Sequence, residues 1–181
     1  ERTVMKKNEI LILYGTEYLE LTKKLLEEAQ LAEMIGDSGK IIGIKPNLVA
    51  PVPAEDGGTT HPEVVEGLLQ YLQEHGFRHL RIMEGSWVGD RTEESFQVCG
   101  YDRLAKQYGV ELIDAQKEPA VSKDCGGMEL HLCRCATEVD FMINVPVMKG
   151  HCQTHITCAL KNMKGLLPNR EKRRFHAEGL H

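Results

Sequence analysis

The chain has 181 residues, of which 41% are hydrophobic and 27% charged, and its formal net charge is −5. This length suits one domain whose hydrophobic core is large enough to fold without disulfides. No apolar run approaches the ~20 residues of a membrane-spanning helix, and the first residues lack the apolar core of a signal peptide, so we expect a cytoplasmic protein with no membrane partner.

The first third of the sequence predicts alternating strands and helices. An apolar strand is expected over 9–14. A helix follows it, with Thr16 as its N-cap and Gly36 as the left-handed residue that often ends a helix. A second strand is expected over 40–45, where Pro46 stops it.

The next helix has the clearest start in the sequence. Thr60-His61-Pro62-Glu63 matches a capping box, in which the side chains of Thr60 and Glu63 each accept a hydrogen bond from the other residue's backbone N–H. Pro62 fits the first turn, where its missing N–H is not needed. We expect this helix to end at Gly76.

The rest of the sequence continues the alternation. The expected elements are strands over 79–83, 110–114, 128–133 and 139–145, a helix over 93–108 that is broken near Gly100, and a short helix over 156–164. The segment 117–127 and the residues beyond Pro168 are expected to be polar and irregular. Strands that alternate with helices predict a three-layer, Rossmann-like α/β fold with a mainly parallel sheet.

Polar side chains gather just after the ends of several expected strands. The carboxyl ends of parallel strands meet at one edge of a sheet, where open α/β proteins bind ligands. The residues that we expect to line one cleft there are Lys45, Asn47, Glu84, Ser86, Asn144 and Lys149. Thr59 lies just before a helix start, where free backbone N–H groups favour a phosphate or carboxylate. The chain has neither G-x-G-x-x-G nor G-x-x-x-x-G-K-[ST], which disfavours dinucleotide and P-loop sites of standard form.

Charge is unevenly distributed along the chain. Residues 1–144 contain 15 Lys and Arg against 25 Asp and Glu, whereas residues 145–181 contain seven against two. This change of sign indicates that the C-terminal segment meets an anion, which Lys149 and Lys161 are expected to hold as point charges. The basic run 170–174 has one aromatic neighbour and no nucleic-acid motif, so we interpret it as a solvated loop and disfavour a nucleic-acid partner.

His151 and His155 are four residues apart, a spacing that puts both imidazoles on one face if the segment is helical. A divalent metal is then one candidate cofactor, with Cys152, Cys158 or Glu84 as a further ligand. Donation of hydrogen bonds from both histidines to an anionic ligand is the favoured alternative.

The six cysteines are too few for a disulfide scaffold, so we expect free thiols. Cys133 and Cys135 would point the same way along a strand, which invites a redox interpretation. Iron–sulfur clusters need about four thiolates at set spacings, and this chain has no such motif. Core or surface thiols are therefore expected.

Four blocks of sequence carry a resemblance to a known family. They are Ile44-Lys-Pro-Asn-Leu48, Thr59-Thr-His-Pro-Glu-Val-Val65, Glu84-Gly-Ser86, and a long block from Asp140 to Gly165. Together they resemble domain-of-unknown-function family 362, a group of uncharacterised bacterial and archaeal proteins. The resemblance implies an α/β domain without a settled activity. The family domain usually runs past the end of this chain, so the resemblance implies a single domain over 1–181 that is truncated at its C-terminus.

The function that the sequence favours is binding of a small anionic molecule, a phosphate or carboxylate, in the strand-end cleft, with catalysis left open. Lysines would hold the anion, while Glu84, Lys149, His151 or His155 would transfer a proton. One alternative is a redox component that binds a metal through His and Cys. Some family members are joined to ferredoxin-type iron–sulfur modules, so the resemblance implies a ferredoxin-like redox partner for that alternative. The other alternative is a binding module without chemistry.

Overall fold

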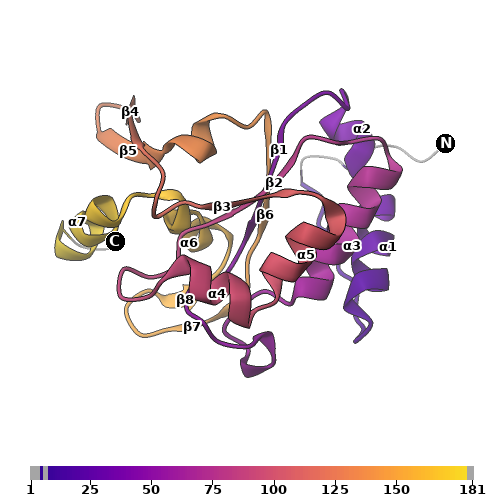
Figure 1. Cartoon of the computed structure of the whole chain (residues 1–181), viewed down its shortest axis with the longest axis horizontal. Helices are drawn as coiled ribbons and strands as arrows, with labels where there is room; N and C mark the ends of the chain where they lie inside the picture. Colours follow the sequence, from indigo (N-terminus) through magenta and orange to yellow (C-terminus); the bar gives the residue numbers. More distant parts are fainter. Residues whose placement is uncertain (1–4, 6–7, 179–181) are drawn as a thin grey trace.

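The computed structural model describes residue 5 and residues 8–178, and its centre is a sheet of four parallel strands. The strands are β1 (Ile42–Pro46), β2 (Leu80–Glu84), β3 (Glu111–Asp114) and β6 (Phe141–Val145). Their order across the sheet is β3-β2-β1-β6, and other elements cover both faces (Figure 1). The expected three-layer, Rossmann-like α/β fold is confirmed.

The register of the sheet brings the strand ends together. β1 pairs with β6 from Ile42 opposite Phe141 to Pro46 opposite Val145. It pairs with β2 on its other side, starting with Ile42 opposite Leu80. The chain that leaves β1 therefore lies between the chains that leave β2 and β6, which is the placement that a strand-end cleft requires.

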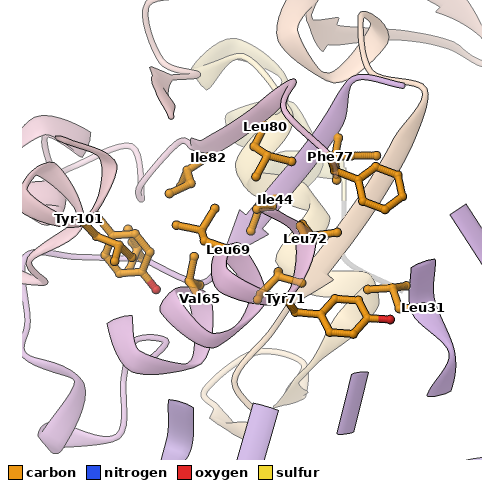
Figure 2. Close-up of a cluster of buried hydrophobic side chains, with 14 of the residues drawn as sticks. Leu31, Ile44, Val65, Leu69, Tyr71, Leu72, Phe77, Leu80, Ile82 and Tyr101 are labelled. Atoms are coloured by element: carbon orange, nitrogen blue, oxygen red, sulfur yellow. The ribbon is translucent and has the colours of Figure 1, made fainter. Parts of the chain in front are cut away.

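One face of the sheet is covered by α3 and α5, and α1 lies on the outer side of α3 (Figure 1). The helices on this side are α1 (Tyr18–Ala29), α2 (Leu31–Ile35), α3 (Pro62–Glu74), α4 (Thr92–Val98) and α5 (Tyr101–Tyr108). Figure 2 shows Leu69 and Leu72 of α3 facing Ile44 of β1 and Ile82 of β2, and all four are fully buried. Each such side chain stabilises the fold by about 1.5–3 kcal/mol, so this cluster is the main source of stability.

The opposite face carries smaller elements. They are the hairpin β4 (Ala120–Asp124) and β5 (Glu129–Cys133), the short helices η2 (Arg134–Thr137), α6 (Ala159–Asn162) and η3 (Met163–Leu166), and helix α7 (Asn169–Glu178). Figure 1 places β4, β5 and α7 on the side of the sheet away from α3. A second, smaller core lies here, formed by Met83, Ala115, Cys133, Cys135 and Leu166. The short helix η1 (Ala54–Asp56) and the hairpin β7 (Lys149–His151) and β8 (His155–Thr157) lie near the strand ends.

The N-terminal part differs from its prediction. The segment 9–14 is irregular rather than a strand, and Ile10, Ile12 and Tyr14 are exposed, because the segment pairs with no described strand. The helix after it begins at Tyr18 with Glu17 as N-cap, one residue later than Thr16 would require. A left-handed Gln30, with φ of 52°, divides it into α1 and α2, and Gly36 ends α2 as expected.

The predicted capping box at the start of α3 does not form. His61 is the N-cap of α3 and makes no side-chain capping bond. The hydroxyl of Thr60 instead accepts the backbone N–H of Asn47 at 2.8 Å and donates to the carbonyl of Val145 at 2.8 Å. This hydroxyl therefore joins the chain after β1 to the end of β6, a use that local sequence cannot reveal.

Three further segments were mispredicted. The polar segment 117–127 contains β4, which pairs antiparallel with β5. The segment 156–164 contains the end of β8 before the helical turns α6 and η3 begin. The residues after Pro168 form helix α7, in which Glu171 and Lys172 are buried, rather than a solvated loop.

Candidate functional site

A buried ion pair lies at the carboxyl ends of β1 and β2. Lys45 is fully buried, and its Nζ lies 2.6 Å from Oε1 of Glu84, which is also buried. The same Nζ donates to the carbonyl of Pro46 at 2.6 Å and to Oδ1 of Asn162 at 3.2 Å. Burial lowers the pKa of Lys45, and the carboxylate of Glu84 opposes that shift. Removing either partner would leave the other charge buried and uncompensated.

The carboxylate of Glu84 is fully engaged by its neighbours. Its Oε2 accepts the N–H of Leu48 at 2.7 Å, and its Oε1 accepts the N–H of Gly85 at 2.8 Å. The hydroxyl of Ser86 donates to the carbonyl of Leu48 at 2.7 Å. These bonds fix the segments after β1 and β2 relative to each other.

Asn162 of α6 connects the C-terminal block to this network. Its Nδ2 donates to Oδ1 of Asn144 at 2.7 Å and to the carbonyl of Lys45 at 3.2 Å. Asn144 in turn donates to the carbonyl of Ala159 at 2.8 Å. Lys45 and Asn144 therefore hold the surrounding segments in place, and neither of them lines the cavity described next.

A cavity of about 740 Å³ borders this network, a size within the range of small-molecule sites. The strand ends contribute Asn47, Glu84 and Ser86 to its wall, the hairpin contributes Lys149 and His151, and the C-terminal helices contribute Lys161, Lys164 and Lys172.

Basic side chains dominate this wall. Among the described residues that line the cavity, the Lys and Arg side chains are Lys149, Lys161, Lys164, Lys172 and Arg173. Within the described part of the chain, the wall has a single carboxylate, Glu84, which is already paired with Lys45. A partly buried group of cations without carboxylate partners favours an anionic ligand.

Burial affects the titration of these lysines. It lowers the pKa of Lys149, Lys161 and Lys164, and repulsion from Lys161 lowers the pKa of the other two further. Burial also lowers the pKa of Lys172 to about 8, although Glu84 opposes this shift. The Nζ of Lys172 donates to the carbonyls of Gly85 at 2.8 Å and Ser86 at 2.9 Å. Lys149 donates to the carbonyl of Gly58.

The two histidines lie opposite each other on the β7–β8 hairpin, rather than on one helix face. His151 lines the cavity, and its Nδ1 accepts the N–H groups of Gln153 at 3.1 Å and Thr154 at 3.2 Å. This arrangement leaves the proton of the neutral ring on Nε2. Burial and the nearby lysines lower the pKa of His151. His155 is exposed, takes a φ of 61°, and lies outside the cavity wall.

Metal ligands do not gather in the described part of the chain. No three His, Cys, Asp or Glu side chains there lie in an arrangement that could hold a metal ion. Cys133 and Cys135 lie in the smaller core, where burial raises the pKa of their thiols to about 11 and about 12. A thiol with a raised pKa stays protonated at neutral pH, and it binds metal poorly because the thiolate is the form that ligates a metal ion. Metal ligation by His151 and His155 stays a prediction.

The structure thus brings most of the predicted residues to one place. Those that line the cavity are Asn47, Glu84, Ser86, Lys149, His151 and Lys161. Thr59 is buried outside it, where its hydroxyl donates to the carbonyl of Val52 at 2.9 Å. His155 is exposed and also lies outside the cavity wall.

Sequence reasoning missed the contribution of α7. Lys172, Arg173 and His176 line the cavity, and Nε2 of His176 lies 3.3 Å from Nζ of Lys164. The available signal was the spacing of Lys172 and His176, because residues four apart share one face of a helix. The dense charge of this run concealed that spacing.

The fold and the cavity define an α/β domain with a cationic site at its strand ends. Residues 42–181 match the family described as Domain of unknown function (DUF362), and because this match covers most of the chain, the chain belongs to that family. A thylakoid-associated protein from Synechocystis sp. is 26% identical over 154 residues. The aligned part covers 82% of this chain and 47% of that protein, so the chain spans about half the length of this relative. No solved structure matches the chain. None of the described helices is both long and apolar enough to cross a membrane.

Proposed function

We propose that the chain binds a small anionic molecule, one that carries phosphate or carboxylate groups, in the cavity at the strand ends. The observation that carries this proposal is the charge of the wall, where the described lining residues include five Lys and Arg side chains and one carboxylate, which Lys45 already neutralises. Partly buried cations lose hydration and repel one another, and an anion relieves both effects.

The polar groups of the wall support the same function. Asn47 and Thr157 line the cavity, and each has a buried oxygen, Oδ1 and Oγ1, without a hydrogen-bond partner among the described residues. The Thr157 hydroxyl can donate a hydrogen bond to an anion, whereas the Asn47 amide oxygen only accepts and would need a donor, such as a hydroxyl group of the ligand. The Nε2–H of His151 adds a donor on the same wall.

Binding has stronger support than catalysis. Both oxygens of Glu84 are engaged by Lys45 and by two backbone N–H groups, so its carboxylate is already committed to the structure beneath the cavity. His151 and Lys149, whose pKa values are both lowered, are the better candidates for proton transfer to a bound substrate. A binding module without chemistry is therefore the second form of the proposal, and turnover of a bound ligand would distinguish the two.

Calorimetric titration tests the binding function. Inorganic phosphate, pyrophosphate and citrate would be titrated into the protein at pH 7 and low salt. We expect at least one anion to bind, and Lys161→Ala to weaken it about tenfold, because a partly buried charge at short range contributes roughly 1–4 kcal/mol. Lys123→Ala is the matched control, since Lys123 is exposed on β4 outside the cavity. Absence of binding for all three anions, or equal effects of the two substitutions, would refute the proposal.

The remaining expectations for partners stay proposals. A cytoplasmic location without a membrane partner would be tested by cell fractionation, which matters because the Synechocystis relative is named for its association with thylakoids. A ferredoxin-like redox partner would require bound metal or a reactive thiol pair. A colourless protein that contains no iron by elemental analysis would remove that alternative.

A further inference from the structure

We propose that the ligand is a nucleotide, with its phosphates among the lysines and its base stacked on Trp87. This inference rests on the anion site proposed above and specifies the class of molecule that occupies it. It concerns the part of the cavity wall that carries no charge.

The cavity has an apolar side as well as a cationic one. Val49, Trp87 and Val88 line it, and Trp87 is 54% exposed. An indole that is open toward a cavity can bind another planar group by stacking. The volume of about 740 Å³ also exceeds what one inorganic phosphate would fill. A ligand with an anionic part and a planar part would use both sides of the wall.

Trp87 is held in place before any ligand binds. Its backbone N–H donates to the carbonyl of Val49 at 2.8 Å, and its backbone carbonyl accepts the N–H of Asp90 at 2.9 Å. The indole lies against the backbone of Gly89, so closely that a Cβ added at Gly89 would overlap the ring. A ring fixed in this way loses little conformational entropy when a base stacks on it.

The stacking surface and the basic side chains share one cavity. Lys172 donates to the carbonyls of Gly85 and Ser86, which immediately precede Trp87 in the chain. Lys164 comes from η3, whose Gly165 carbonyl lies directly against Gly85. One molecule can therefore reach the ring and the lysines together.

The neighbourhood of the ring favours no particular base. The Nε2 of Gln116 is engaged by the carbonyls of Ser86, Trp87 and Asp90 at 3.2 to 3.3 Å. Its donors are therefore not free to read the edge of a base. Recognition by stacking alone tolerates every base, because each has a π-face.

Trp87 is the only tryptophan in the sequence, so intrinsic fluorescence reports directly on this surface. The protein would be titrated with ADP, pyrophosphate and adenosine, with calorimetry in parallel. We expect ADP to quench the emission and to bind about tenfold more tightly than pyrophosphate, which should bind with little change in emission. Adenosine should bind most weakly, and GDP and UDP should match ADP within a few-fold.

Two substitutions isolate the stacking contribution. Trp87→Leu should reduce the affinity for ADP about tenfold, or roughly 1.4 kcal/mol, and leave pyrophosphate unchanged, while Trp87→Phe should retain most of the affinity. Gly89→Ala should produce the same selective loss with the fluorophore still present, because the new Cβ displaces the ring. Tyr14→Leu is the matched control, since Tyr14 is exposed and lies outside the cavity. Circular dichroism would confirm that each variant is folded.

The outcomes separate this inference from the binding function beneath it. Pyrophosphate binding that depends on Lys161, together with ADP binding no tighter than pyrophosphate, would overturn the nucleotide and leave the anion site standing. A gain for ADP that survives both Trp87→Leu and Gly89→Ala would also overturn it, because the base would then lie elsewhere. If neither ADP nor pyrophosphate bound at all, the inference would fail together with its phosphate site.

Discussion

The two faces of the sheet differ in what they bury. The face under α3 is closed by a continuous apolar cluster that contains Ile44, Leu69 and Ile82. The other face has a small core with two cysteines, and it adjoins buried charges and the cationic cavity. Stability and binding are thus largely separated in this fold, because the large apolar cluster offsets the unfavourable burial of charge at the strand ends.

The largest test of this contrast is removal of one buried charge. Glu84→Leu should reduce the free energy of unfolding by about 3–5 kcal/mol, since it leaves Lys45 charged in a dry site. The double variant Lys45→Met/Glu84→Leu should be more stable than Glu84→Leu alone, because it leaves no unpaired ion. Urea denaturation of these two variants and of Lys45→Met alone completes the comparison. A double variant as unstable as the sum of the single variants would show that the two residues do not act as a pair.

A substitution that creates a cavity in the apolar cluster is the matching test on the other face of the sheet. Leu69 is fully buried in the middle of α3, so Leu69→Ala should reduce the free energy of unfolding by about 2–5 kcal/mol. Anion affinity of the folded variant should not change. Leu160→Ala serves as control, since Leu160 is 93% exposed and surface substitutions have effects within about 0.5 kcal/mol. A change in anion affinity for Leu69→Ala would show that the two faces are coupled.

The effect of pH on anion affinity is expected to be smaller in free energy than the two effects on stability. The pKa of Lys172 is lowered to about 8, so this side chain loses its charge as the pH rises from 7 to 9. Affinity for pyrophosphate should fall by about threefold to tenfold over that range, as one short-range attraction is lost. Binding at pH 8 should take up protons, which calorimetry detects in buffers of different ionisation enthalpy. Lys172→Met should remove most of the proton uptake.

The same lysine affects stability in the opposite sense. Its folded pKa lies below the ordinary value of 10.5, so the unfolded chain binds more protons between about pH 8 and pH 10.5. The contribution of Lys172 to the free energy of unfolding therefore rises with pH across that window and is lost as the pH falls through 8.

The last test compares the reactivity of the cysteines and requires no change in stability. Cys125 and Cys152 are exposed and should react rapidly with a thiol reagent in the native protein. Cys133 and Cys135 should react only after unfolding, because burial raises the pKa of both thiols. Mass spectrometry of the labelled protein would identify the sites. Rapid native labelling of Cys133 would contradict the closed second core.

The sequence predicts the centre of the fold better than its periphery. Apolar runs located β1, β2, β3 and β6 within about two residues, because buried parallel strands are marked by such runs. Residues 9–14 have the same apolar character and yet form no strand, since no described strand pairs with them. The half-buried state of β6 also follows from its place at the sheet edge rather than from its composition.

The site shows the same division. Lys45, Glu84 and Lys149 could be placed together because parallel strands end at one edge. The role of Lys172 could not, because it depends on the packing of α7 against the carbonyls of Gly85 and Ser86. Thr60 illustrates the limit most clearly, since its hydroxyl bonds two strand-end segments that are far apart in the sequence.

Gly165 has a consequence for how the cavity and the sheet communicate. It lines the cavity, and a Cβ at this position would overlap Oε1 of Glu84 and lie 2.9 Å from Nζ of Lys45. The backbone of Gly165 therefore lies against the ion pair, of which Glu84 reaches the cavity wall and Lys45 does not. An anion bound in the cavity would therefore act at short range on the ends of β1 and β2, and a larger residue at position 165 would have to displace the side chains of Lys45 and Glu84.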